Sequence, residues 1–157
     1  EIADGWFPLY YSPWRQDVYA DQLVGADDDF QVSVICPFVV TGGSEEEIAQ
    51  GLAGIQMMLA FYIGGMGAEG QNYHTKLAAR MGLGDAATEI QRLFLSGDQA
   101  GAIDAVPAGF ADETALVGPP ERIRERLAVW RDSPVTTLMI HASDAHGLRT
   151  AAELVLG

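Results

Sequence analysis

Two groups of side chains in this sequence have types and spacing that could do chemistry. His141 and Asp144 come directly after an apolar run, and an imidazole beside a carboxylate can move a proton in an acid–base reaction. Near the start of the chain, Tyr10, Tyr11 and Trp14 fall close together in a segment interrupted by Pro13. These aromatic rings either pack in the core or line a pocket, and both interpretations remain open at this point.

Three further features favour structural over chemical roles. Cys36 lies within an apolar run and fits a small buried thiol, with a redox role as the alternative. As the one cysteine, it excludes an internal disulfide and a zinc site built from several cysteines. The glycines of Gly64–Gly67 lack the strand and helix context of a dinucleotide-binding loop, so they indicate a helix stop. His74 and His146 are expected at the surface.

Composition narrows the class of partner. The chain has 157 residues, of which 48% are hydrophobic and 20% charged, and this balance is typical of one globular domain. A net charge of −13 argues against binding to nucleic acid or to an anionic membrane. The longest apolar run is expected to be too short to span a bilayer, and no signal peptide is recognised, so a cytoplasmic location is expected. Because no Met precedes Glu1, we also expect the sequence to begin inside a larger protein.

The elements that must position these residues can be predicted from periodicity. A helix is expected to begin at Pro120, with Ile123, Leu127 and Trp130 forming one apolar stripe. The run Thr137–Ile140 has no polar alternation, which is typical of a strand covered on both faces. Phe30–Val40 is the clearest strand, and Pro37 within it implies a bulge or an unpaired position.

The other elements follow from caps and stops. Gly5–Leu9 is predicted to be a short strand. Ser44 and Glu47 fit a capping box at the start of a helix that runs to about Tyr62. Phe110–Val117 is expected to be a connector. Further helices are predicted over residues 72–81, 85–96 and 98–106. A closing helix is predicted from a stripe of Leu148, Ala151, Ala152 and Val155.

Strands separated by helices lie parallel, so the chain is predicted to be an α/β protein with about three parallel strands. Three parallel strands with two open edges make a poor sheet by themselves. We therefore expect the sheet to be completed by another polypeptide or by the rest of the domain.

Two stretches resemble the luciferase-like flavin-dependent monooxygenase family, especially its branch that uses the 5-deazaflavin cofactor. The first is EIADGWFP at Glu1–Pro8, and the second runs from Leu59 to Ile140. The second contains FYIGGMG, NYHTKLAARMG, Val106-Pro107 and ALVGPPERIRERLAVW, in that order. The ordered set carries the resemblance; no single motif does.

The resemblance implies that the chain is the C-terminal part of a (β/α)₈ TIM barrel. Gly5–Leu9, Phe30–Thr41 and Thr137–His141 would be the sixth, seventh and eighth strands. Residues 1–157 would form one domain, and Leu59–Val117 would be the family's helical insertion within it. The first five strands would be missing, together with the loop that helps to hold the cofactor phosphate in the family.

The same resemblance implies a site at the carboxyl ends of the strands, where this fold carries its chemistry. The candidate substrate-pocket residues there are Trp6, Tyr10, Tyr11, Trp14, His141 and Ser143. Aromatic rings could stack on a flat cofactor ring and exclude water, and His141 could donate to a substrate carbonyl. The implied cofactor is coenzyme 5-deazaflavin or FMN. The implied partners are a small organic substrate and either a second copy of the chain or the missing barrel portion.

Two other functions remain open in the sequence. The chain could be a catalytically silent half-barrel that serves as an assembly or binding module, because its strand edges are open. It could also be a small α/β domain with its own pocket, in which His141 and Asp144 form the acid–base pair. The resemblance favours an oxidoreductase or monooxygenase.

Overall fold

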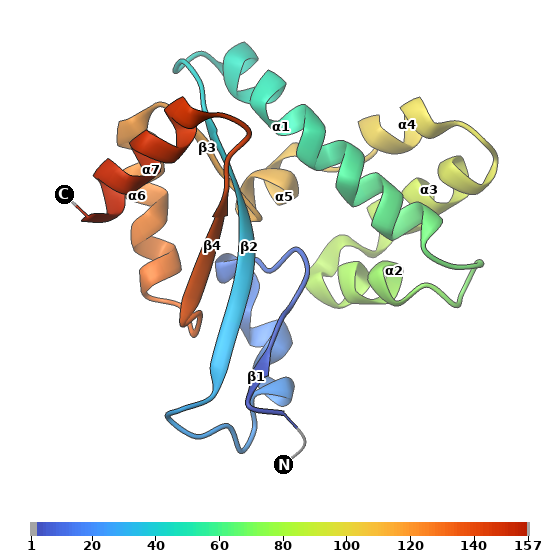
Figure 1. The fold of residues 1–157 in the computed structure, drawn as a ribbon. Helices are drawn as coiled ribbons and strands as arrows, with labels where there is room; N and C mark the ends of the chain where they lie inside the picture. The colour runs from blue at the N-terminus through green and yellow to red at the C-terminus, as the bar shows by residue number, and fades with distance from the viewer. Residues whose placement is uncertain (1–2, 157) are drawn as a thin grey trace. The chain divides into compact units, whose positions relative to one another are not determined.

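The computed structural model describes residues 3–156, so Glu1 and Ile2 of the first matching stretch lie outside it. The described chain contains four strands with helices between them (Figure 1). The strands are β1 (Gly5–Trp6), β2 (Gln31–Val40), β3 (Leu116–Gly118) and β4 (Thr137–His141). The chain divides into two compact units. One holds the residues up to Gly51 and from Asp112 onward, and the other holds Leu52–Ala111.

Strand β2 organises the sheet, because it pairs in parallel with each of the other three strands. Its first residues pair with β1, its middle with β4 and its last three with β3. The parallel arrangement predicted from the sequence is therefore confirmed. The ladder with β4 runs through Pro37 without a change of register, so no bulge forms there.

The two faces of this sheet differ sharply in burial. On one face of β2 the side chains of Val32, Val34, Cys36 and Phe38 are buried. On the other, Ile35 is 43% exposed, and its register partner Met139 on β4 is 36% exposed. The prediction that Thr137–Ile140 is covered on both faces is therefore wrong for this chain, since only the helix side of the sheet is covered.

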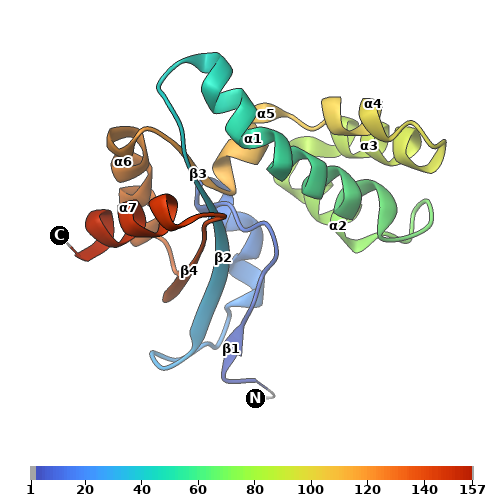
Figure 2. The ribbon, with the colours of Figure 1, turned by 45° about the horizontal axis from the view of Figure 1, so that its top comes forward.

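The covered face packs against helices α6 (Pro120–Arg131) and α7 (Ala145–Leu156), which lie side by side next to β4 (Figure 2). The stripe predicted for α6 is confirmed, because Ile123, Leu127 and Trp130 are all buried. The stripe predicted for α7 is wrong in part. Its buried residues are Gly147, Thr150 and Ala151, and Leu148 is 53% exposed.

Between β1 and β2 the chain forms the 3₁₀ segment η1 (Pro13–Gln22).

Two elements that follow Pro107 were not expected from the sequence. Helix α5 (Ala108–Glu113) and strand β3 occupy the segment that was predicted to be a connector. Both are short, and the pairing of β3 with Phe38–Val40 of β2 is a long-range contact that no local pattern reveals.

Helix α1 (Glu45–Ala60) begins as the sequence predicts. The Ser44 hydroxyl accepts a hydrogen bond from the Glu47 amide at 3.2 Å, and the Glu47 carboxylate accepts one from the Ser44 amide at 3.1 Å. The helix continues through a π-helical turn, η2 (Phe61–Gly65), so the predicted stop at Gly64 falls slightly later. By length and composition alone, Glu45–Gly65 could cross a membrane, which corrects the expectation that no apolar stretch is long enough. Helices of soluble cores pass the same test.

The second unit is helical. It contains α2 (Tyr73–Ala78), the π-helical turn η3 (Ala79–Leu83), α3 (Gly84–Leu95) and α4 (Gln99–Asp104). Asn72 is 1% exposed and caps α2, accepting hydrogen bonds from the amides of His74 and Thr75. Its amide nitrogen donates to the carbonyls of Tyr62 and Ile63 in the π-helical turn, at 2.8 and 2.9 Å. Asn72 thus joins α2 to the end of the preceding helix.

Candidate active site

The open face of the sheet carries three cross-strand pairs between β2 and β4. Residues that are register partners in neighbouring strands point to the same side of a sheet. The pairs are Ser33 with Thr137, Ile35 with Met139 and Pro37 with His141. The face thus presents an apolar centre, with a hydroxyl pair on one side and an imidazole toward the carboxyl end of β4.

His141 and Ser143 lie at the carboxyl end of β4, as the sequence predicts, and both are exposed. Asp144 has a different role from the proposed acid–base partner. Its carboxylate accepts a hydrogen bond from the Gly147 amide at 2.7 Å, and its carbonyl accepts one from Leu148, so it caps helix α7. Within residues 3–156, no hydrogen bond or ion pair is found between His141 and Asp144, and the small-domain hypothesis loses its support.

The predicted aromatic residues of the first segment separate into two groups. Tyr11 is 1% exposed and packs in the core, with ring centroids 5.0 Å from Tyr19 and 6.1 Å from Trp130. Trp6 joins the same cluster, at 5.3 Å from Tyr19. Burial raises the pKa of the Tyr11 phenol, so this hydroxyl stays protonated at neutral pH.

Tyr10 lies in the turn between β1 and η1, and Trp14 is the second residue of η1. Tyr10 is half-buried and has a φ of 54°, a left-handed conformation that a bulky residue adopts only when its surroundings hold it. Trp14 is 40% exposed, and the Arg126 guanidinium of α6 lies over its ring, 4.4 Å from the ring centroid. We call the segment Tyr10–Trp14 the aromatic loop.

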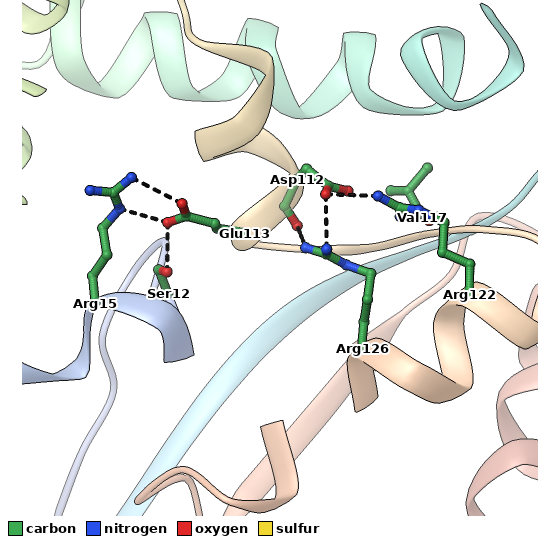
Figure 3. Close-up of polar contacts among 7 residues, drawn as sticks. All are labelled: Ser12, Arg15, Asp112, Glu113, Val117, Arg122 and Arg126. Atoms are coloured by element: carbon green, nitrogen blue, oxygen red, sulfur yellow. Dashed lines mark hydrogen bonds and ion pairs between the residues drawn. The ribbon is translucent and has the colours of Figure 1, made fainter. Parts of the chain in front are cut away.

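A network of charged side chains links the end of α5 to helix α6 and strand β3 (Figure 3). The Asp112 carboxylate pairs with Arg122 at 2.8 Å and Arg126 at 2.9 Å. Arg126 also donates to the Asp112 carbonyl at 2.6 Å, and Arg122 donates to the Val117 carbonyl. Burial lowers the pKa of Arg126, and the charge of Asp112 opposes that shift.

The neighbouring Glu113 faces the other way, toward η1. Its carboxylate accepts two hydrogen bonds from the Arg15 guanidinium, at 2.6 and 2.9 Å, and one from the Ser12 hydroxyl at 2.9 Å. The residues of this cluster were not found by sequence reasoning. The sequence shows only scattered charges there, because Glu113 and Arg15 are 98 positions apart.

A cavity of about 710 Å³ lies away from the predicted site. It is lined by residues at the amino-terminal ends of β1 and β2, including Asp4, Asp27 and Phe30. In this fold that end of the strands serves stability, so the cavity does not mark the reaction site. Among the described residues, no group of His, Cys, Asp or Glu side chains is arranged to hold a metal ion.

Comparison with known proteins defines the class. Residues 1–137 match the family described as luciferase-like monooxygenase. A protein of Mycobacterium tuberculosis, named as a candidate coenzyme F420-dependent oxidoreductase, is 35% identical over an alignment of 164 positions. That alignment covers 99% of this chain and 46% of the relative. The coenzyme F420-dependent tetrahydromethanopterin reductase of Methanopyrus kandleri has a similar structure, with a TM-score of 0.65 at 16% identity.

The chain belongs to the luciferase-like monooxygenase family. Its fold corresponds to part of that family's TIM barrel, and the structural match covers 99% of this chain and 45% of the reductase. The chain thus spans about half the length of the relatives it matches. The family resemblance and the partial-barrel fold inferred from the sequence are both confirmed.

Proposed function

We propose that this chain is the C-terminal part of an oxidoreductase barrel that uses coenzyme F420, a 5-deazaflavin, on a small apolar organic substrate. The observation that carries the proposal is the open face of β2 and β4, whose burial pattern is that of a barrel interior with one side absent. The names of the relatives support F420 over FMN. For the reaction we propose hydride transfer rather than oxygen activation.

The side chains on the open face suit a flat ring with polar edges. Ile35 and Met139 offer an apolar surface, and His141 and Thr137 provide polar groups beside it. When bound, the deazaflavin accepts or donates a hydride at its ring. The residues of this chain would bind the substrate, turn its reacting carbon toward the ring and keep water out.

The predicted site residues take the following roles in this proposal. His141 donates a hydrogen bond to a substrate carbonyl, and Ser143 lies beside it at the strand end. Tyr10 and Trp14 form the rim of the pocket. Trp6 and Tyr11, which pack with Tyr19, support that rim from behind.

The rest of the site comes from polypeptide that completes the barrel. We propose that residues 59–117 are the helical insertion of this barrel, that the complete protein acts in the cytoplasm and that it forms homo-oligomers. The alternative, a silent half-barrel used for assembly, draws on the same open face. It is less well supported, because the relative matched along 99% of the chain is named as an oxidoreductase.

A charge on the open face tests the proposal. In the protein with its barrel complete, I35K should weaken binding of oxidised F420 by more than about tenfold, because a buried unpaired charge is costly. The matched control is L148K, which changes an exposed apolar residue on the outer helix α7 and should leave the dissociation constant unchanged. Fluorescence titration of F420 gives both constants. Equal binding by I35K and L148K would contradict the proposal.

A further inference from the structure

The carboxylate of Glu113 is the point where the end of α5 is tied to the aromatic loop. It accepts three hydrogen bonds, one from Ser12 and two from the guanidinium of Arg15. The ion pair is largely shielded, since the side chains of Arg15 and Glu113 are 27% and 21% exposed. A bidentate pair of this kind fixes orientation as well as distance.

The aromatic loop that Glu113 contacts contains strained backbone at Tyr10. Tyr10 has a φ of 54°, and the next two residues, Tyr11 and Ser12, are buried at 1% and 0% exposure. Strained backbone of this kind persists where neighbouring structure determines it, and it is concentrated at functional sites. Ser12 donates its hydroxyl to Glu113 directly after this strained turn. The Glu113 carboxylate therefore fixes the position at which the chain leaves Tyr10.

The other end of the loop is held by the adjacent acidic residue. Trp14 lies under Arg126, and the Arg126 guanidinium is bound by the carboxylate and carbonyl of Asp112. Asp112 and Glu113 are consecutive at the end of α5, and their side chains point in opposite directions in Figure 3. Together they fix both ends of the aromatic loop.

We propose that Glu113 is a positioning residue for the cofactor pocket, which sets Tyr10 against the deazaflavin ring through Ser12 and Arg15. The inference rests on the proposed function, because it assigns Tyr10 to the pocket. Glu113 itself faces Ser12 and Arg15, so its effect on the cofactor would pass through the backbone of the loop.

The test compares five variants of the protein with its barrel complete, of which the fifth is S12A. E113Q removes the negative charge to which Ser12 and Arg15 donate, and it keeps the shape of the side chain. Y10N removes the aromatic ring, and Asn tolerates a left-handed backbone. The double variant E113Q/Y10N tests whether the two act together. E121Q is the matched control, because Glu121 lies exposed in the first turn of α6. Oxidised F420 is the ligand for every titration.

We expect E113Q and Y10N each to raise the dissociation constant of F420 about fivefold to tenfold. The double variant should bind no more weakly than Y10N, since both changes remove the same contact. E121Q should bind like the unaltered protein. The absorption spectrum of bound F420 should shift in E113Q, which a loss of folded protein alone would not cause. S12A removes one of the three hydrogen bonds to Glu113. It should change binding in the same direction by a smaller factor.

The outcomes separate this inference from the proposed function. Unchanged affinity and spectrum in E113Q would overturn the positioning role alone. Full additivity of E113Q and Y10N would also overturn it, because the two residues would then act independently. If E113Q does not fold, unchanged F420 affinity and an unchanged spectrum in S12A would overturn the positioning role. Failure of the unaltered protein to bind F420 would overturn the proposed function and this inference together.

Discussion

Cys36 is fully buried on the covered face of β2, and burial raises the pKa of its thiol. The folded chain therefore keeps the proton more tightly than the unfolded chain does. Stability is unaffected below the unfolded pKa and falls as the pH rises from there toward the folded pKa. A thiol reagent such as Ellman's reagent should react slowly with the native protein and should release one equivalent after unfolding in urea. Rapid reaction of the native thiol would contradict the packing described for β2.

Asn72 makes four hydrogen bonds from a buried position, and its loss should be costly in the helical unit. N72A leaves the Tyr62 carbonyl and two helix amides without their partner. We expect a loss of about 2 kcal/mol in the free energy of unfolding, measured by urea denaturation. The control is Q71A at the exposed neighbouring position, where the change should stay within about 0.5 kcal/mol. A similar small effect for N72A would show that Asn72 does not hold this unit together.

Single residues of the candidate site could be predicted from the sequence where they follow a strand. His141 and Ser143 come directly after a recognisable apolar run, so their position at a strand end was predictable. The clamp of Glu113, Arg15 and Ser12 was not, because its members are about 100 positions apart and nothing local links them. Tyr10 and Tyr11 are adjacent aromatic residues, and only the turn at Tyr10 determines which of them enters the core.

At the scale of the elements, periodicity and capping residues predicted the long helices. Periodicity failed where the burial of a side chain depends on residues far away in the sequence. The stripe of α6 is complete within this sequence and was found. The apolar run of β4 suggests two covered faces, but one face has no partner among residues 3–156. Strand β3 has three residues, too few to show a period. The apolar face of β4 is itself a sign that more polypeptide belongs on it.

Two glycines of α1 give opposite predictions. A Cβ at Gly51 would lie 2.6 Å from Val117 Cγ1 and 2.9 Å from Thr41 Cγ2, and both neighbours are stiff β-branched residues. A Cβ at Gly54 would meet nothing within 4 Å. We expect G51A to destabilise the fold by about 1 kcal/mol or more. G54A should stabilise it by about 0.5–1 kcal/mol through helix propensity. Thermal unfolding measures both, and stabilisation by G51A would show that α1 does not pack closely on β3.

The capping box of α1 should give a pH-dependent contribution. Hydrogen bonds from the Ser44 hydroxyl and amide lower the pKa of Glu47. A lowered pKa stabilises the fold above the unfolded value of 4.5, and this stabilisation is lost as the pH falls through the folded pKa. S44A should therefore lower the thermal stability of the protein near neutral pH, and by less at about pH 3. An equal cost at both pH values would mean that the Glu47 carboxylate does not take part in the cap.

At the scale of the whole molecule, the account depends on the sheet being one side of a barrel. The chain spans about half of its relatives, and one sheet face presents apolar side chains to solvent. A soluble protein rarely leaves such a face uncovered. The net charge of −13 gives the surface as a whole no general attraction for anions. At the start of α1, the Ser44 amide and hydroxyl both donate to the Glu47 carboxylate.

The most direct test is to titrate the protein, with its barrel complete, with oxidised F420 and with FMN in parallel by isothermal calorimetry. The account predicts saturable binding of one F420 per barrel, with FMN at least about tenfold weaker, a difference of about 1.4 kcal/mol. Tighter binding of FMN would contradict the deazaflavin assignment. Binding of neither cofactor would contradict the central claim that this sheet forms part of a cofactor-binding barrel.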